Sequence, residues 1–360
     1  MRILNYYVTK NYIATFFMAI AVLTFGMVGA QLMRVFEYLS RGIPISTAME
    51  FLLYTLPQAL SFTVPWASLV SIMLVFGRMS ADNEITAMRA CGISILQIVS
   101  PVIVTTFLFT CICLYLQLEV GPRAMGNARS MMREVVVHHP MALFTPGIPV
   151  EMQRINLLFD SKDEEGNLYD IYIYVFDNKG NIQQDFTASR GKIVPIENTQ
   201  TLDITLYDAT ITSYENGKIH TFSREFKFPL EYGKRFNERE VSRKDKYLTI
   251  REIYARSIIE KRHGIDTTHL EMELNQRIAL AVAPIAFLLL GLPLAIRTSR
   301  RETSIGLFIS VLLAGAYFGS VMLSDALSKR PEFYPQYLVW IPPFLYQLFG
   351  GIYLTKISRM

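Results

Sequence analysis

The sequence predicts a polytopic α-helical membrane protein, with six transmembrane helices and an all-β domain inserted between the third and the fourth. The first observation is an uneven distribution of charge. Residues 119–277 hold 22 Lys+Arg and 24 Asp+Glu side chains, whereas the other 201 residues hold only 13 and 7. The second is that the charge-poor part contains apolar stretches of 19 residues and more, close to the about 20 residues that a helix needs to cross a bilayer. A single soluble globule, a disordered chain and a disulfide scaffold are therefore excluded.

Hydropathy separates six candidate spans. They lie at residues 12–33, 51–77, 93–118, 278–296, 305–324 and 337–355. The first is longer than a signal-peptide core of about 7–15 residues, so we expect it to be retained. Pro57 and Pro65 interrupt the second, which is long enough to tilt or kink.

The orientation follows from the basic residues of the short loops, which stay preferentially in the cytoplasm. With the N-terminus inside, the cytoplasmic set would be Arg2, Lys10, Arg78, Arg89, Arg297, Arg300, Arg301, Lys356 and Arg359. The opposite set would be only Arg34, Arg41, Lys329 and Arg330. We therefore expect both termini in the cytoplasm and the central block outside.

The central block contains short β-branched and aromatic runs that are typical of strands. The clearest are Ile171–Phe176, Leu202–Tyr207 and Ile219–Phe222, and Asn178–Gly180 and Glu215–Gly217 lie between such runs as tight turns. Six to eight strands between residues 147 and 228 predict a sandwich or jelly roll.

Two helices are expected after the strands. Thr249-Ile-Arg-Glu252 has the spacing of a capping box, and it would open a helix with Ile253, Tyr254, Ile258 and Ile259 on one side. His263-Gly264 would end that helix, and the next would run from about Thr267 into the fourth span.

The sequence lacks the residue patterns that indicate ion transport, catalysis, or the binding of metals, nucleotides or nucleic acids. None of the six stretches contains Asp, Glu, Lys, Arg or His, whereas ion-driven transporters and intramembrane proteases use such groups at membrane depth. The sequence has no phosphate-binding G-x-x-x-x-G-K-[ST] loop, no H-x-x-x-H pair and no basic–aromatic nucleic-acid signature. We therefore expect no catalytic residues, no metal, no cofactor and no nucleic-acid partner.

The loop between the second and third spans is the most informative segment. Ile85, Met88 and Gly92 recur at helical spacing, and Glu84 and Arg89 lie elsewhere around the turn. A short amphipathic helix over about residues 80–92 would fit at the membrane face. It is either a surface linker or a coupling helix that docks on a peripheral motor subunit.

Several motifs of the chain resemble one known family. They are Pro57…Pro65…Gly77…Glu84-Ile-x-Ala-Met-Arg-Ala-x-Gly92-Ile-Ser94, Glu273-Leu-Asn-x-Arg277 leading into Pro284 and Leu292-Pro293-Leu, and the basic cluster Arg297–Arg301. With the order of three spans, β domain and three spans, they closely resemble the LptF/LptG permeases of the lipopolysaccharide exporter. The Ala-Cys-Gly-Ile-Ser ending and Glu-Leu-Asn-x-Arg look nearer to LptF. Asn83 departs from the Ser of many relatives, but both residues can cap a helix.

The resemblance implies a non-catalytic permease half in the bacterial inner membrane. Its partners would be a second LptF/LptG-type half, a cytoplasmic ABC ATPase dimer, a small membrane protein with a periplasmic domain, and a periplasmic bridge protein. The chain would divide into spans one to three (1–118), a periplasmic β jelly-roll domain with connecting helices (119–277) and spans four to six (278–360). Glu84, Ile85, Met88, Arg89 and Gly92 would couple the permease to the ATPase.

Two further sets of residues have alternative interpretations. Arg34 and Arg41 resemble basic residues that grip lipid A phosphates in relatives, but interfacial anchoring would also explain them. Gly315 and Gly319 form a small-xxx-small pattern that also arises by chance. The resemblance places the first and fifth spans at the seam between permease halves, which would make these glycines part of that interface.

Two functions compete at this stage. The first is a lipopolysaccharide export permease that extracts the lipid from the outer leaflet and passes it to the periplasmic bridge, driven by a separate ATPase. The alternative is a membrane-anchored sensor or scaffold whose outer β domain binds a ligand. A sensor needs an output domain, whereas the expected cytoplasmic parts here are short loops and tails.

Overall fold

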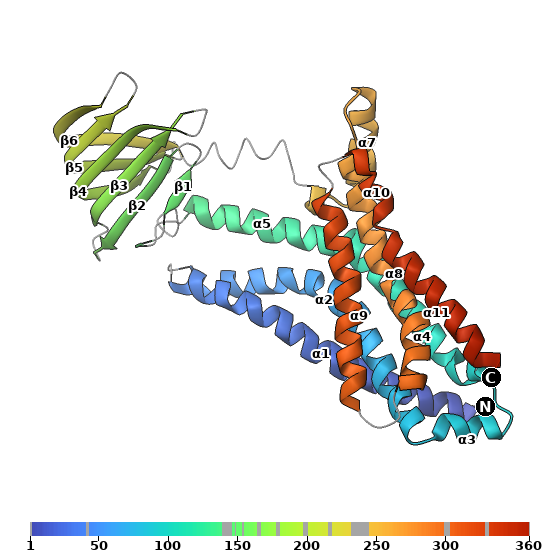
Figure 1. Ribbon diagram of the computed structural model, residues 1–360. Helices are drawn as coiled ribbons and strands as arrows, with labels where there is room; N and C mark the ends of the chain where they lie inside the picture. Colours follow the sequence, from blue (N-terminus) through green and yellow to red (C-terminus); the bar gives the residue numbers. More distant parts are fainter. Residues whose placement is uncertain are drawn as a thin grey trace. The chain divides into compact units, whose positions relative to one another are not determined.

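The structure, a computed structural model, divides into two compact units, which we describe separately (Figure 1). The helical unit comprises residues 1–33, 52–128 and 244–360, and the β unit comprises residues 34–51 and 129–243. The described residues are 2–40, 43–138, 146–147, 149–152, 155–163, 167–177, 181–196, 201–214, 218–231, 245–298, 303–327 and 331–359. The expected turns at Asn178–Gly180 and Glu215–Gly217 lie outside them.

Among the described residues, six helices are long and apolar enough to cross a membrane, which confirms the predicted spans. The main span helices are α1 (Arg2–Ser40), α2 (Ile45–Ala81), α4 (Ile95–Tyr115), α8 (Thr268–Thr298), α9 (Thr303–Ala326) and α11 (Ile341–Arg359). A one-turn helix, α10 (Pro335–Leu338), precedes α11. The sequence did not predict that α4 continues through a π-helix, η1 (Leu116–Val120), into α5 (Gly121–His138).

The prolines of α2 do not break the helix, although each removes a backbone donor. Pro65 cannot bond the carbonyl of Ser61, four residues earlier. That carbonyl instead accepts a hydrogen bond from Gln117 Nε2 at 3.4 Å. A side chain of η1 thus compensates for the missing donor, as membrane helices require at their prolines.

Two helices, α2 and α8, form the centre of the helical unit. Within the chain, 78% of the most apolar stretch of α2 and 67% of that of α8 are buried. The corresponding shares are only 11% for α1 and 22% each for α9 and α11. Helices α1, α9 and α11 therefore present most of their apolar surface to lipid or to another protein.

Hydroxyl groups join the peripheral helices to their neighbours. The Tyr12 hydroxyl lies 2.8 Å from Ser68 Oγ and 3.1 Å from Thr106 Oγ1, which ties α1 to α2 and α4. Tyr317 donates to the Ala279 carbonyl at 2.6 Å, which ties α9 to α8. Interhelical hydrogen bonds of this kind fix helix positions where apolar packing alone has little preference.

The two ends of the helical unit differ in what they carry. The chain termini lie at one end, together with the short helix α3 (Glu84–Ala90) between α2 and α4 (Figure 1). The other end carries α10 and the helix α7 (Ile250–Arg262), which precedes α8. The first turn of α1, the last turn of α11 and α3 therefore share one end of the helical unit.

The described part of the β unit forms one antiparallel sheet of six strands, which confirms an inserted β domain. The strands are β1 (Val150–Met152), β2 (Ile155–Lys162), β3 (Asn167–Phe176), β4 (Ile182–Ile196), β5 (Thr201–Ser213) and β6 (Ile219–Glu231). Each strand pairs with the next along the chain. The three runs singled out in the sequence lie in β3, β5 and β6.

The sheet bends in the middle of its long strands. In β5, Ile204 and Leu206 are buried at even positions but Ala209 at an odd position, and Asp208 between them has a φ of 52°. Asp170 in β3 has the same left-handed φ. A left-handed residue of this kind interrupts the extended backbone and shifts the alternation of buried side chains, and the two halves of the sheet share one apolar interior.

The bent sheet provides the apolar interior of the β unit. Gly191 of β4 lies where its two neighbouring strands are closely packed. A Cβ atom there would lie 2.5 Å from Ile171 Cδ1 and 2.9 Å from the Thr205 carbonyl oxygen. The described strands form one antiparallel meander, and Gly191 permits the close approach of the strands on either side of it.

The capping box of α7 is confirmed. The Thr249 side chain accepts from the Glu252 amide, and the Glu252 carboxylate accepts from the Thr249 amide at 2.7 Å. The expected apolar face of α7 is wrong, because Ile253 is buried whereas Tyr254, Ile258 and Ile259 are exposed. Ile253 and Tyr254 are adjacent, so they point about 100° apart on a helix of 3.6 residues per turn.

Candidate functional site

The short helix α3 is built by its two termini. It begins at Glu84 after Asn83, whose φ is 58°, and it ends at Ala90. Gly92, with a φ of 83°, donates to the Arg89 carbonyl at 2.9 Å, and Ile93 donates to the Met88 carbonyl at 3.1 Å. These two bonds form a Schellman motif, in which a glycine in the left-handed conformation closes the helix.

The structure corrects two expectations about this segment. Asn83 occupies the N-cap position, but its side chain makes no capping hydrogen bond. Its left-handed backbone is the property that matters, since Asn tolerates this conformation better than most residues do. Gly92 does not belong to an extended helical face, because it lies beyond the end of α3 and terminates it.

The remainder of the motif starts the next helix. Ser94 accepts from the Gln97 amide, and the Gln97 side chain accepts from the Ser94 amide at 3.0 Å, which is a capping box. Gly92 and Ser94 are thus explained by the turn between α3 and α4. This turn does not account for the two charged side chains of α3, Glu84 and Arg89.

One side of α3 is attached to the helical unit and the other is open. Ile85 is 4% exposed and belongs to the main apolar core, against which Met88 also packs. Thr86, Ala87, Ala90 and Cys91 are exposed. The open side therefore carries small residues, with the partly exposed Glu84 and Arg89 on either flank.

A residue that the sequence analysis missed holds Glu84. The Tyr7 hydroxyl of α1 donates to both carboxylate oxygens of Glu84, at 3.1 and 3.2 Å. The two residues are 77 positions apart, and no spacing in the sequence connects them. Tyr7 also precedes the expected start of the first span at Tyr12, so neither hydropathy nor a motif draws attention to it.

The two sets of residues expected at other sites are less enclosed. Arg34 in α1 is exposed, and Arg41 lies outside the described residues. Gly315 and Gly319 lie on an exposed side of α9, and an added Cβ at either would meet no atom within 4 Å. Nothing in the described chain thus occupies the surface beside these two glycines.

At the opposite end of the helical unit, Arg277 of α8 anchors the chain that follows the β unit. Its side chain is 5% exposed and donates to the carbonyls of Leu248 at 2.6 Å and Asp245 at 3.1 Å, and to Glu273 at 2.8 Å. Asp245 begins a 3₁₀ turn, η4 (Asp245–Tyr247). The Glu-Leu-Asn-x-Arg motif therefore fixes the point at which the chain returns to the helices.

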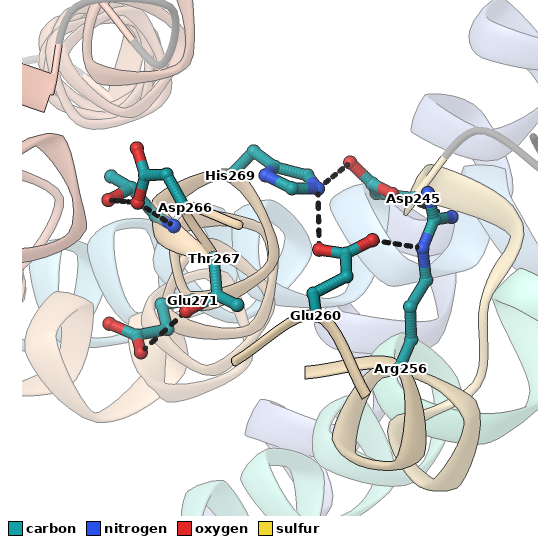
Figure 2. A network of polar contacts seen from close by, with 8 residues as sticks. Asp245, Arg256, Glu260, Asp266, Thr267, His269 and Glu271 are labelled. Atoms are coloured by element: carbon teal, nitrogen blue, oxygen red, sulfur yellow. Dashed lines mark hydrogen bonds and ion pairs between the residues drawn. The ribbon is translucent and has the colours of Figure 1, made fainter. Parts of the chain in front are cut away.

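A polar network extends from this anchor (Figure 2). His269 Nε2 lies 3.6 Å from a carboxylate oxygen of Asp245 and 3.6 Å from one of Glu260. Arg256 bonds the other oxygen of Glu260 at 2.7 Å and lies 3.3 Å from Asp245. The network ties α7, α8 and η4 together.

A cavity of about 240 Å³ lies beside the same anchor. Its lining includes two cations, Lys246 and Arg277, and two carboxylates, Asp325 and Glu273. Lys246 donates to Asp325 at 3.0 Å and Arg277 to Glu273 at 2.8 Å. Because each positive charge is already paired, this cavity is a poor receptor for a phosphate.

Comparison with known proteins identifies the chain. A family model described as the lipopolysaccharide export system permease LptF/LptG matches residues 6–356, which is nearly the whole sequence. The chain belongs to the LptF/LptG family. A comparison with curated proteins finds no match.

Membership of the LptF/LptG family confirms the resemblance seen in the sequence and favours a permease over a sensor. The family model covers LptF and LptG together, so the preference for LptF stays a prediction. The structure adds a physical meaning to the motifs that carried the resemblance. Gly92 and Ser94 shape the turn after α3, and Glu273 and Arg277 anchor η4.

Proposed function

We propose that this LptF/LptG chain is one half of a permease that extracts lipopolysaccharide from the outer leaflet of the inner membrane. A second half of the same family would complete the permease. A cytoplasmic ABC ATPase dimer would supply the energy, and the lipid would pass to a periplasmic bridge protein. A small membrane protein with a periplasmic domain would complete the assembly.

The observation that carries this proposal is the geometry of α3. The helix projects from the end of the helical unit that also carries both termini (Figure 1). Its attached side is set by Ile85, and its open side offers small residues between Glu84 and Arg89. Small residues let another protein approach closely. The two charges would fix the orientation of that protein and its specificity.

The location of the parts follows from the basic residues of the short loops. The end with α3 would face the cytoplasm, and the block of residues 119–277 would lie in the periplasm. With the β unit outside, a lipid leaving the outer leaflet would meet the β domain without crossing the membrane. The chain itself would be non-catalytic, so that ATP hydrolysis depends on the partner.

Two surfaces fit the remaining partners. Arg34 is exposed, so that its guanidinium is available to a lipid A phosphate, with which it can form bidentate, charge-assisted hydrogen bonds. Arg41 would act beside it. Gly315 and Gly319 leave the surface of α9 open, and small residues at such spacing let a second helix approach closely. We therefore place the second permease half against α9.

Glu84→Ala tests the proposal at its most specific residue. Losing one partner of a hydrogen-bonded charge pair at an interface costs about 2–5 kcal/mol, which is roughly 30-fold to several-thousand-fold in affinity. The variant, expressed with the second half and the ATPase, should insert normally but lose the ATPase during purification. Asp82→Ala is the matched control, because Asp82 is an exposed carboxylate two residues earlier in the same loop.

Two readouts decide the outcome: the amount of ATPase retained on the permease, and lipopolysaccharide release from proteoliposomes. Loss of both in Glu84→Ala, with little change in Asp82→Ala, supports the proposal. If Glu84→Ala keeps wild-type retention and release, α3 is a surface linker and the assignment of the coupling site is wrong.

A further inference from the structure

The contact between Tyr7 and Glu84 connects two elements that are distant in the sequence. Tyr7 lies in the second turn of α1, and Glu84 is the first residue of α3. The tyrosine hydroxyl donates to both carboxylate oxygens, at 3.1 and 3.2 Å. A donor shared in this way resists rotation of the carboxylate about its last bond, because either rotation lengthens one of the two contacts.

Helix α3 needs such a contact. It has seven residues, which is well below the about 12–15 residues at which an isolated helix becomes marginally stable in water. Its N-cap side chain makes no capping bond. The start of α3 is therefore held by two side-chain contacts, the burial of Ile85 and the hydrogen bond from Tyr7 to Glu84.

We propose that Tyr7 is a positioning residue for Glu84, which it holds in the orientation that engages the ATPase. The inference rests on the proposed function, because it assumes that Glu84 binds the motor. An ionised carboxylate offers about four acceptor sites. Tyr7 uses one site on each oxygen, which leaves the others for an arginine or lysine of the ATPase.

The same contact gives α3 a connection to the rest of the bundle. Tyr12 follows Tyr7 by about one and a half turns of α1, and its hydroxyl lies 2.8 Å from Ser68 of α2 and 3.1 Å from Thr106 of α4. A force applied to Glu84 would thus reach α1 through this contact, in addition to α2 and α4, to which α3 is joined by the backbone. Since α1 is the least buried of the span helices, it is also the one whose displacement disturbs the fewest internal contacts.

The decisive experiment compares Tyr7→Phe with Tyr6→Phe in the complex of the chain, its second permease half and the ATPase. Both changes remove one hydroxyl from neighbouring positions of α1, but Tyr6 is 68% exposed and has no hydrogen bond to α3 among the described residues. We expect Tyr7→Phe to weaken ATPase retention by about three- to tenfold, as a partly exposed hydrogen bond to a charge allows. Tyr6→Phe should leave retention unchanged.

A double variant shows whether Tyr7 acts through Glu84. Glu84→Gln removes the charge that the motor would bind, so adding Tyr7→Phe to it should lower retention by less than about twofold further. Hydrogen exchange of residues 84–90 in the permease without ATPase gives an independent readout. It should be faster in Tyr7→Phe than in Tyr6→Phe, because the start of α3 loses one of its two anchors.

The outcomes separate this inference from the function on which it rests. If Glu84→Gln releases the ATPase while Tyr7→Phe matches Tyr6→Phe in retention and exchange, the positioning role of Tyr7 is overturned and the coupling role of Glu84 stands. If Glu84→Gln itself retains the ATPase fully, the proposed coupling site fails, and the role of Tyr7 fails with it. Additive losses in the double variant would also overturn the inference, because Tyr7 would then act independently of Glu84.

Discussion

Replacement of Arg277 by Met should detach the chain from α8 at the point where it returns from the β unit. The guanidinium is 5% exposed and donates to Leu248 O, Asp245 O and Glu273 Oε1. Met fills a similar volume but donates nothing. The Leu248 carbonyl and a Glu273 carboxylate that is itself only 13% exposed then lose this donor, whereas the Asp245 carbonyl keeps the Leu248 amide.

The magnitude follows from the burial of these groups. Removing one member of a buried ion pair costs about 3–5 kcal/mol, and each backbone carbonyl left unsatisfied adds to the cost unless water reaches it. We therefore expect residues 245–249 to open more easily by about 3–5 kcal/mol. At about 1.4 kcal/mol per decade, their amide exchange should accelerate by roughly two to three and a half orders of magnitude.

Hydrogen exchange of the purified chain in detergent measures this directly. The informative amide is that of Leu248, which donates to the Asp245 carbonyl at 3.1 Å. Lys261→Ala serves as the control, because it removes an ion pair to Glu271 whose side chains are 59% and 40% exposed, and such pairs contribute about 0–1 kcal/mol. Unchanged protection of residues 245–249 in Arg277→Met would refute the anchoring role, and uniform loss across α8 would show general unfolding instead.

Three further predictions follow from the same contacts and from the topology. Lys246→Ala should destabilise the helical unit by less than about 1 kcal/mol, since the lysine side chain is 61% exposed. The hydrogen bond to Asp325 raises the pKa of Lys246. In thermal melts, the stabilisation by this ion pair should therefore persist at neutral pH and disappear only at alkaline pH, as the pH rises through that pKa. With Cys111 and Cys113 replaced, a cysteine at Lys218 should react with a membrane-impermeant maleimide in intact spheroplasts whereas Cys91 should not, and the opposite pattern would invert the orientation. Arg34→Glu should lower lipopolysaccharide release at unchanged assembly, because a lipid phosphate would meet a negative charge instead of a donor; equal release at matched expression would leave Arg34 as an interfacial anchor.

The spans and the β domain could be predicted because each depends on a property that is local in the sequence. A membrane helix needs a continuous apolar stretch, and a strand of this domain needs an alternating run of β-branched or aromatic residues. The capping box at Thr249 and Glu252 was recognisable for the same reason, since its two partners are three residues apart. Properties of a few adjacent residues suffice for all three.

The bend of the sheet and the closure of α3 depend on the backbone conformation of single residues. Asp170 and Asp208 adopt left-handed φ angles inside strands, and the sequence around them gives no sign of this conformation. Gly92 was read as part of a helical face because its spacing from Ile85 and Met88 fits one. Its φ of 83° shows that it ends the helix instead. Periodicity alone does not distinguish a glycine that continues a face from one that terminates it.

The contacts that matter most for the proposed mechanism were beyond the reach of the sequence, because they join residues that only the packing of helices brings together. Tyr7 meets Glu84 across 77 positions, and Arg277 meets the Asp245 carbonyl across 32. In both cases the motif contained one partner, Glu84 or Arg277, and the other had no distinguishing feature. In both cases, the charged residue of the motif indicates where the site lies. Its partner, which belongs to no motif, fixes the orientation of the charged side chain. The partner of Glu84 lies on α1, the span helix with the smallest buried share. If α3 couples to the ATPase as proposed, this contact would pass its motion to α1, beside the backbone connections of α3 to α2 and α4.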